Sequence, residues 1–126
     1  MRALAVKVIP HEQQRYNTVG DYFTDEDGVE QFRISLLAEN KYEHLAMIHE
    51  IVERVLTFHA GVTNDAIDQF DIAFEKRREK EILGEPGDDP KAPYYRMHQI
   101  ATIVERIVAA ELGVDWHQYE LSLNDL

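Results

Sequence analysis

Hydrophobic and polar residues alternate with a period of two along the first third of the chain, which is typical of β-strands. In the first such segment Leu4, Val6 and Val8 alternate with smaller or charged residues. The acidic turn at residues 25–28 ends in Gly28, which tolerates positive φ, and it predicts a hairpin between the segments on either side. The segments with this pattern are residues 2–9, 18–24 and 29–37. Together they predict a small antiparallel sheet.

From about residue 40 the period changes from 2 to 3.6, which predicts amphipathic helices. Glycines that follow an apolar stripe mark helix ends, and Thr, Asp or Pro mark helix starts. The predicted helices are 40–60, ended by Gly61; a second from the N-cap Thr63 to near Gly84; a third from Pro93 to Gly113; and a short one capped by Asp115.

The apolar stripe of each predicted helix is expected to face the core. For the second helix we expect Ile67, Phe70 and Phe74 to point inward. The stripe of the first helix is Leu45, Ile48, Val52, Val55, Leu56 and His59, and that of the third is Met97, Ile100, Ala101, Val104, Ile107, Val108 and Leu112.

The predicted fold class is therefore α+β, with a small N-terminal antiparallel sheet, three long amphipathic helices and a short C-terminal helix. A chain of 126 residues fits one domain and buries roughly two-thirds of its unfolded surface. We expect a single domain over residues 1–126, with a β-element at 1–38 and a helical part at 39–121.

The net charge of −11, from 13 Lys and Arg against 24 Asp and Glu, argues against binding to nucleic acid. Such binding needs clustered cations, and Glu residues interrupt the one basic segment at 76–80. The chain has no cysteine, no signal-peptide pattern and no apolar run near the ~20 residues that span a bilayer. We expect a cytoplasmic protein without a membrane partner, whose apolar helices permit a homodimer.

Each of the three long helices places two potential metal ligands one or two turns apart along the edge of its apolar stripe. If these edges meet, imidazoles and carboxylates converge as they do in metal sites between bundle helices. Such donors suit a divalent ion, Zn²⁺, Mn²⁺ or Fe²⁺, and the few histidines and many carboxylates make Mg²⁺ or Mn²⁺ competitive. The candidate ligands are His49 and Glu53, Asp71 and Glu75, and His98 and Glu105.

Two motifs on these helices resemble known metal sites. His49-Glu50-Ile51-Val52-Glu53 resembles the HExxH helix of zinc peptidases, with Glu53 at the second His. That resemblance implies a zinc ligand at each end of the motif and Glu50 as the base that activates water. Glu50-x-x-Glu53, followed after fourteen residues by Asp68-x-x-Asp71, resembles the ExxE…ExxD pattern of MazG-like nucleotide pyrophosphohydrolases. Those enzymes hold Mg²⁺ with four carboxylates, although here Asp68 replaces a Glu and Glu50 points away from the apolar face.

A broader resemblance covers about residues 15–119. The segments HEIVE, FDIAFE and EPGDDPKAPY look like those of small proteins encoded by tailed phages and prophages. This implies a setting, the cytoplasm of an infected host cell, and not a particular reaction. Glu85, Asp88 and Asp89, on a loop stiffened by Pro and Gly, are then expected to lie over the site between the helices.

Two functions fit these residues. The first is a metal-binding protein that hydrolyses a phosphoester or nucleotide, with Glu50 as its base. The alternative is a non-enzymatic phage accessory protein that inhibits a host defence protein through an acidic surface. The sequence leaves open whether the chain is an enzyme.

Overall fold

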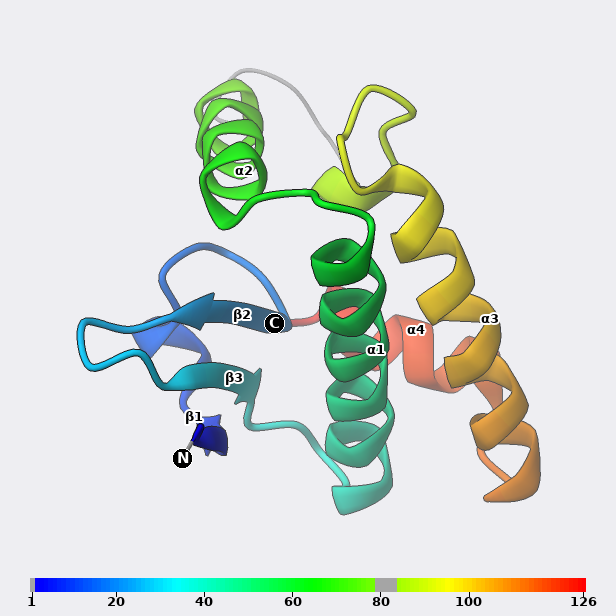
Figure 1. Ribbon diagram of the computed structural model, residues 1–126. Coiled ribbons are helices and arrows are strands. Elements are labelled where there is room, and N and C mark those ends of the chain that lie inside the picture. Colours follow the sequence, from blue (N-terminus) through cyan, green and yellow to red (C-terminus); the bar gives the residue numbers. More distant parts are fainter. Residues whose placement is uncertain (1, 79–83) are drawn as a thin grey trace.

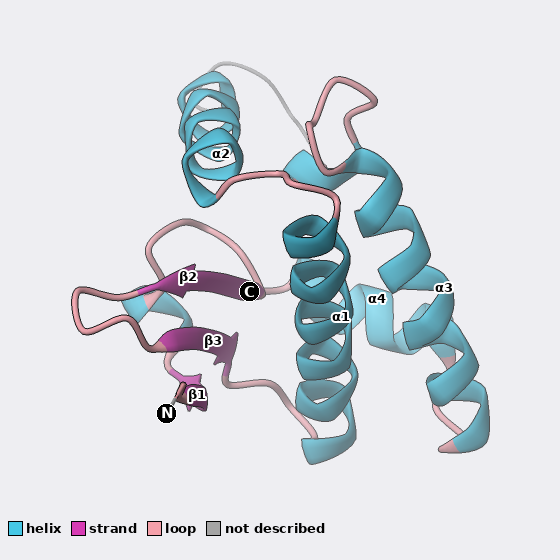
Figure 2. Cartoon of the chain, viewed as in Figure 1, coloured by secondary structure: helices cyan, strands magenta, loops and turns pink. Residues whose placement is uncertain are grey.

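The computed structural model describes residues 2–78 and 84–126, which form a small sheet followed by helices, and the α+β class is confirmed (Figures 1 and 2). The strands are β1 (Leu4–Ile9), β2 (Gly20–Thr24) and β3 (Glu30–Ser35). The helices are α1 (Asn40–His59), α2 (Asn64–Arg78), α3 (Tyr95–Glu111) and α4 (Trp116–Asn124), with 3-10 turns η1 (His11–Gln13) and η2 (Pro86–Asp88).

The sheet has the order β1-β3-β2 and is mixed. β2 and β3 form the predicted antiparallel hairpin, and Gly28 in its turn has φ +79°. β1 pairs with β3 in parallel, with Val6 opposite Phe32, whereas we expected only antiparallel pairing. The segment after β1 carries the chain past β3 to the far edge of the sheet, so β1 and β3 run in the same direction. Alternation predicts a strand and its buried face but does not choose its partner.

The helix ends follow the predicted signals. Gly61 and Gly113, with φ of +77° and +68°, end α1 and α3. The Thr63 hydroxyl accepts a hydrogen bond from the Ala66 amide at 3.1 Å, and Asp115 caps α4. The predicted end of the second helix near Gly84 falls at residues 79–83, outside the described residues.

α1 stands between the sheet and α3, and α2 crosses near the C-terminal end of α1 (Figure 1). α1 and α3 are antiparallel neighbours, because Glu53 contacts His98 near the start of α3, whereas His49, which is earlier in α1, contacts Glu105, which is later in α3. The loop that carries η2 covers the start of α3 and contacts α2. Side chains from α1, α3 and η2 therefore meet at one place.

Two apolar clusters flank this place along both helices. One is made by Tyr22, Phe32, Ile67, Ala92 and Tyr94, and the other by Tyr42, Leu45, Ala109 and Tyr119. Residues 98–105 of α3 lie between Tyr94 of the first cluster and Ala109 of the second, and residues 46–50 of α1 lie between Leu45 of the second and Ile51, which packs against the first. Polar groups in these segments are enclosed by apolar packing on two sides.

The predicted inward faces of α1 and α3 are wrong in part, because both helices are rotated from the expected orientation. Val55 is 50% exposed and Ile107 is 61% exposed, although both belong to the apolar stripes. α2 agrees with its prediction, since Ile67 and Phe74 are buried and Phe70 packs against them. The faces that α1 and α3 bury instead carry His49, Glu53, Thr57, His98 and Glu105.

Within residues 2–78 and 84–126, none of the helices combines the length and the apolar character needed to cross a bilayer.

Candidate metal centre

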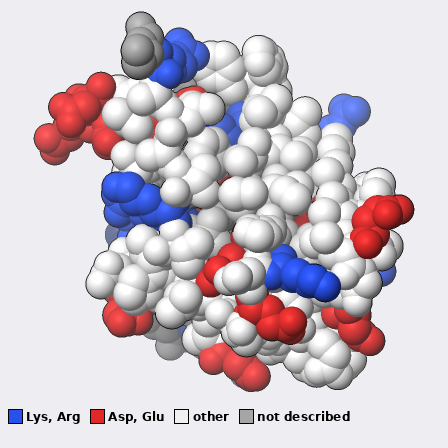
Figure 3. Space-filling view, turned by 90° about the horizontal axis from the view of Figure 1, so that it is seen from below, with Lys and Arg blue, Asp and Glu red and all other residues white. Residues whose placement is uncertain are grey.

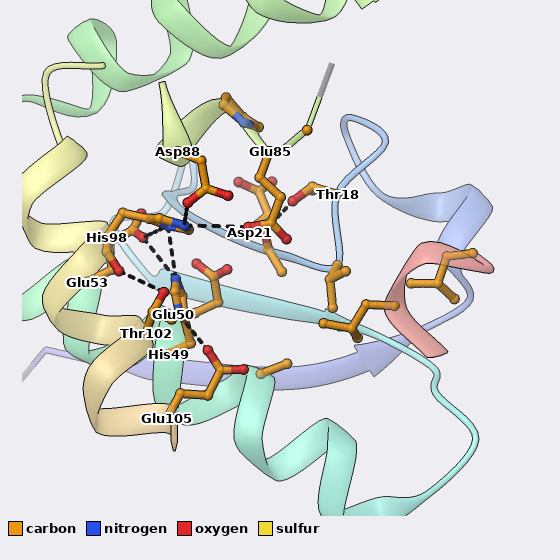
Figure 4. Close-up of a pocket in the computed structure, with 18 of the residues that line it drawn as sticks. Thr18, Asp21, His49, Glu50, Glu53, Glu85, Asp88, His98, Thr102 and Glu105 are labelled. Atoms are coloured by element: carbon orange, nitrogen blue, oxygen red, sulfur yellow. Dashed lines mark hydrogen bonds and ion pairs between the residues drawn. The ribbon is translucent and has the colours of Figure 1, made fainter. Parts of the chain in front are cut away.

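Two histidines and one glutamate from α1 and α3 converge at the centre of the fold (Figure 4). His49 and Glu53 are one turn apart on α1, and both face His98 on α3. The Nε2 atom of His49 lies 3.1 Å from Oε2 of Glu53 and 3.1 Å from Nδ1 of His98. The same Glu53 oxygen lies 2.9 Å from Nδ1 of His98. These three atoms form a nearly equilateral triangle, which we call the metal triad.

The size of the triad matches the ligand spacing of a small divalent ion. Ligand bonds of roughly 2.0–2.1 Å in tetrahedral geometry place donor atoms about 3.3–3.4 Å apart. The three edges, 2.9 to 3.1 Å, are within a few tenths of an ångström of that spacing. Two imidazoles and one carboxylate are also the ligand set of several catalytic zinc sites.

The outward nitrogen of each histidine meets a second carboxylate. His49 donates from Nδ1 to Oε1 of Glu105 at 2.7 Å, and Nε2 of His98 lies 3.2 Å from Oδ1 of Asp88. A carboxylate acceptor keeps a proton on the nitrogen that it contacts, so the lone pair of each neutral imidazole points inward. Carboxylates placed in this way orient metal-bound histidines in many sites.

Glu53 is oriented as well. The Tyr22 hydroxyl donates to Oε1 of Glu53 at 2.8 Å, which leaves Oε2 to face the two imidazoles. Glu53 and His98 are 5% and 6% exposed, so the triad is buried. Taking these charges out of water is costly, and a cation shared among them offsets that cost.

Without an ion, protons on the two imidazoles offset the cost of burying the carboxylates. Burial alone would lower the pKa of His49, but hydrogen bonds to Glu105 and Glu53 outweigh it and raise the pKa to about 11. For His98 burial is likewise outweighed, by Asp88 and Glu53, and the pKa rises to about 10. Burial would raise the pKa of Glu53, yet the two histidines lower it to about 2. The triad therefore holds two protons or one cation.

Glu50 lines the same cavity, one residue after His49, and its side chain lies against Gly20 of β2. A Cβ at position 20 would overlap the Glu50 carboxylate, so glycine makes room for it. Burial and the neighbouring Glu53 charge raise its pKa. Among the described residues, no hydrogen bond or ion pair to Glu50 is formed, which leaves its carboxylate available to a water molecule or a substrate.

The structure brings four of the six predicted ligands together and separates the other two. His49, Glu53 and His98 form the triad, and Glu105 supports His49 from outside it. Asp71 lines the cavity but is bonded to the Tyr94 hydroxyl, and Glu75 forms an ion pair with Arg78 on α2. Asp71 and Glu75 are not placed as ligands of this site because α2 lies across the end of α1 and not beside the triad.

The EPGDDP loop reaches the site as expected. Asp88 contacts Nε2 of His98, and Oε2 of Glu85 lies 3.5 Å from the same nitrogen. Asp89 points elsewhere, 4.0 Å from Arg77. Gly87 packs directly against the His98 ring, since a Cβ there would lie 2.5 Å from Cγ of the ring.

The sequence did not point to two buried tyrosines of the site: Tyr22, which donates to Glu53, and Tyr119, which lies near Glu105. Tyr22 lies in a strand with alternating residues, so its burial was predictable while its bond to Glu53 was not. The Tyr119 hydroxyl lies near Glu105, and burial together with that carboxylate raises its pKa. No signal in the sequence connects α4 to the site.

Comparisons with models of protein families, with curated proteins and with solved structures find no match for this chain. The triad and its surroundings are therefore the features of the molecule that point to a function.

Proposed function

We propose that the chain binds one divalent metal ion, with Zn²⁺ the best fit, through His49, Glu53 and His98, and is a metal-dependent hydrolase. The observation that carries this proposal is the triad itself, in which three donor atoms lie 2.9–3.1 Å apart. Each of the three ligands also contacts a second residue through its other polar atom. The likeness of residues 49–53 to the HExxH helix supports the same ligands.

The reaction follows from the position of Glu50. An ion at the triad acidifies a water molecule and polarises the substrate. Glu50 takes the proton of that water, the water oxygen bonds to the electrophilic carbon or phosphorus, and the bond to the leaving group breaks. Glu50 then returns the proton to the leaving group, so that one water is consumed and no redox partner is needed.

Calorimetric titration of chelator-treated protein with ZnCl₂ tests the binding step. We expect one ion per chain for the wild type, and no measurable binding for His49→Ala or His98→Ala. Glu50→Gln should bind zinc normally, because Glu50 is not in the triad. Unchanged zinc binding in both histidine variants would contradict the proposed ligands.

The catalytic step is tested with zinc-loaded protein and two chromogenic probes, p-nitrophenyl acetate and bis(p-nitrophenyl) phosphate. Hydrolysis above that by free zinc is expected in the wild type. Glu50→Gln should lower it by about 10²-fold or more while zinc remains bound. Equal rates in wild type and Glu50→Gln would exclude Glu50 as the base.

A second candidate is the phage accessory protein that inhibits a host protein. Its support is the net charge of −11 and the resemblance of residues 15–119 to phage-encoded proteins. On the face shown in Figure 3, however, acidic side chains are interspersed with Lys and Arg, so this face offers no uniformly acidic surface. An inhibitor needs no ion, and its binding to a host protein should survive His98→Ala.

A further inference from the structure

The metal triad opens into a cavity of about 590 Å³ whose walls are rich in carboxylates. The described residues that line it include two arginines and no lysine, and both arginines are engaged. Arg78 is paired with Glu75, and Arg106 stacks over Trp116. The acidic side chains of the wall outside the triad and its support Glu105 are Asp21, Glu50, Asp71, Glu85, Asp88 and Glu120.

A single divalent ion does not neutralise this cavity. With both histidines neutral, the ion balances Glu53 and one further carboxylate. The remaining negative charge disfavours a polyanion such as a nucleotide triphosphate, because like charges held close together repel. The same charge attracts a cationic group.

Asp71 is the wall carboxylate best placed to receive such a group. The Tyr94 hydroxyl donates to Oδ1 of Asp71 at 2.5 Å, and among the described residues Tyr94 is its one hydrogen-bond partner. Asp21, by contrast, is already neutralised by two hydrogen bonds from Arg15, at 2.7 and 3.0 Å. Asp71 therefore keeps an oxygen free and has no cationic partner.

The surroundings of Asp71 suit an ammonium or guanidinium group. The aromatic residues Tyr22 and Tyr94 also line the cavity, and the Tyr94 hydroxyl contacts Asp71. Aromatic faces attract cations, and a carboxylate at the end of an aromatic pocket provides the ion pair. Burial, opposed by the Tyr94 hydrogen bond and reinforced by Glu53, Asp21 and Asp68, raises the pKa of Asp71 to about 7.

Asp71 and the triad also line the same cavity. Tyr94, the N-cap residue of α3, binds Asp71 through its hydroxyl, and the amide of His98 one turn later donates to the Tyr94 carbonyl at 2.9 Å. A molecule held at the triad therefore shares this cavity with Asp71.

We propose that the substrate is an amide or ester that carries a positively charged amine or guanidinium, with its carbonyl at the triad and its cation at Asp71. This inference rests on the proposed metal-dependent hydrolysis. Water adds to the carbonyl carbon, the C–N or C–O bond breaks, and the proton from Glu50 goes to the departing amine or alcohol. The products are a carboxylic acid and that amine or alcohol.

Binding of three hydroxamates of matched length to zinc-loaded protein tests the proposal by calorimetry. 6-Aminohexanohydroxamate ends in a cation, hexanohydroxamate in a methyl group, and adipic monohydroxamate in a carboxylate, while pyrophosphate serves as the polyanion. We expect the cationic probe to bind about tenfold or more tightly than the neutral one, as a hydrogen-bonded charge pair provides. The anionic probe and pyrophosphate should bind most weakly.

Asp71→Asn should abolish the preference for the cation without changing zinc affinity, while Asp65→Asn, an exposed acid on the same helix, should leave it intact. If Asp71→Asn does not fold, Tyr94→Phe, which removes the bond that orients Asp71, should weaken the preference. Zinc binding with tightest affinity for pyrophosphate or the anionic probe would overturn the substrate class but not the metal site. Absence of zinc binding by the wild type would overturn both.

Discussion

The Nε2 atom of His49 and the Nδ1 atom of His98 lie 3.1 Å apart in the buried interface of α1 and α3. Both contact the same oxygen of Glu53, and the other nitrogen of each ring contacts a further carboxylate. Two neutral imidazoles in this arrangement direct lone pairs at one point. The site can therefore hold either protons or a metal ion, and we predict that the two forms differ in stability and in pH dependence.

The two histidines should act as one unit in metal binding. A bound ion stabilises the fold by roughly 3 kcal/mol at 100 times its dissociation constant. His49→Ala and His98→Ala should each abolish the rise in melting temperature on adding zinc, and the double variant should lose little more. His44→Ala and His117→Ala, which alter exposed histidines, should keep the full response. Loss of the response in His44→Ala would show that other histidines bind the metal.

Glycine at position 87 should be needed for the orientation of His98. A Cβ at this position would lie 2.5 Å from Cγ and Nδ1 of the ring, and Nδ1 is the atom in the triad. Gly87→Ala should therefore weaken zinc affinity by about tenfold or more, as displaced supporting groups do in other sites. Gly84→Ala is the matched control, because a Cβ there meets nothing within 4 Å. Equal zinc affinities of the two variants by calorimetry would contradict this packing.

Glu105 should raise zinc affinity without contacting the ion. Its carboxylate accepts the Nδ1 proton of His49 and so makes Nε2 a better ligand. Glu105→Gln should reduce zinc affinity by about 10–100-fold while the protein remains folded. Glu111→Gln, on an exposed position of the same helix, should have no effect. Competition with a fluorescent zinc chelator measures both variants, and undiminished affinity in Glu105→Gln would remove Glu105 from the site.

The metal-free protein should lose stability as the pH rises above neutral. His49 and His98 have folded-state pKa values of about 11 and about 10, above their unfolded value of about 6.5. The folded state thus holds more protons than the unfolded state between these limits, so the stabilisation is complete below pH ~6.5 and is lost as the pH passes through the folded values.

Urea unfolding in the presence of a chelator, at pH 6, 7, 8 and 9, measures this trend. A progressive fall is expected for the wild type and for His44→Ala, and a smaller fall for His49→Gln. With zinc in excess the trend should reverse near neutral pH, because zinc displaces protons and binds more tightly as the pH rises. A metal-free stability that is constant from pH 6 to 9 would contradict the protonated network.

The sequence predicted the fold class, the helix ends and the β2–β3 hairpin because these depend on local signals. Gly61, Gly113, Thr63 and Asp115 act through their own backbone and side-chain bonds, which neighbouring residues determine. The parallel partner of β1 was not predictable in this way, since it depends on the path of a loop far from the strand.

The site was predicted in part, for a related reason. Spacing along α1 placed His49 and Glu53 on one edge, and the structure confirms that this edge meets His98 of α3. Periodicity indicated that the apolar stripes face the core, and there it failed: the polar edges are buried while Val55 and Ile107 are exposed. The apolar stripe shows which residues avoid water in an isolated helix. Polar side chains that bond to one another, as those of the triad do, can be buried in place of part of that stripe.

Zinc K-edge X-ray absorption on the purified protein loaded with one equivalent of zinc tests the central claim most directly. The triad predicts nitrogen and oxygen ligands at about 2.0–2.1 Å, with the outer-shell signature of two imidazoles. In His98→Ala that signature should fall to one imidazole or the zinc should be lost. A wild-type spectrum of hydrated zinc without imidazole scattering would contradict the site and leave the triad as a buried network of protonated histidines and carboxylates.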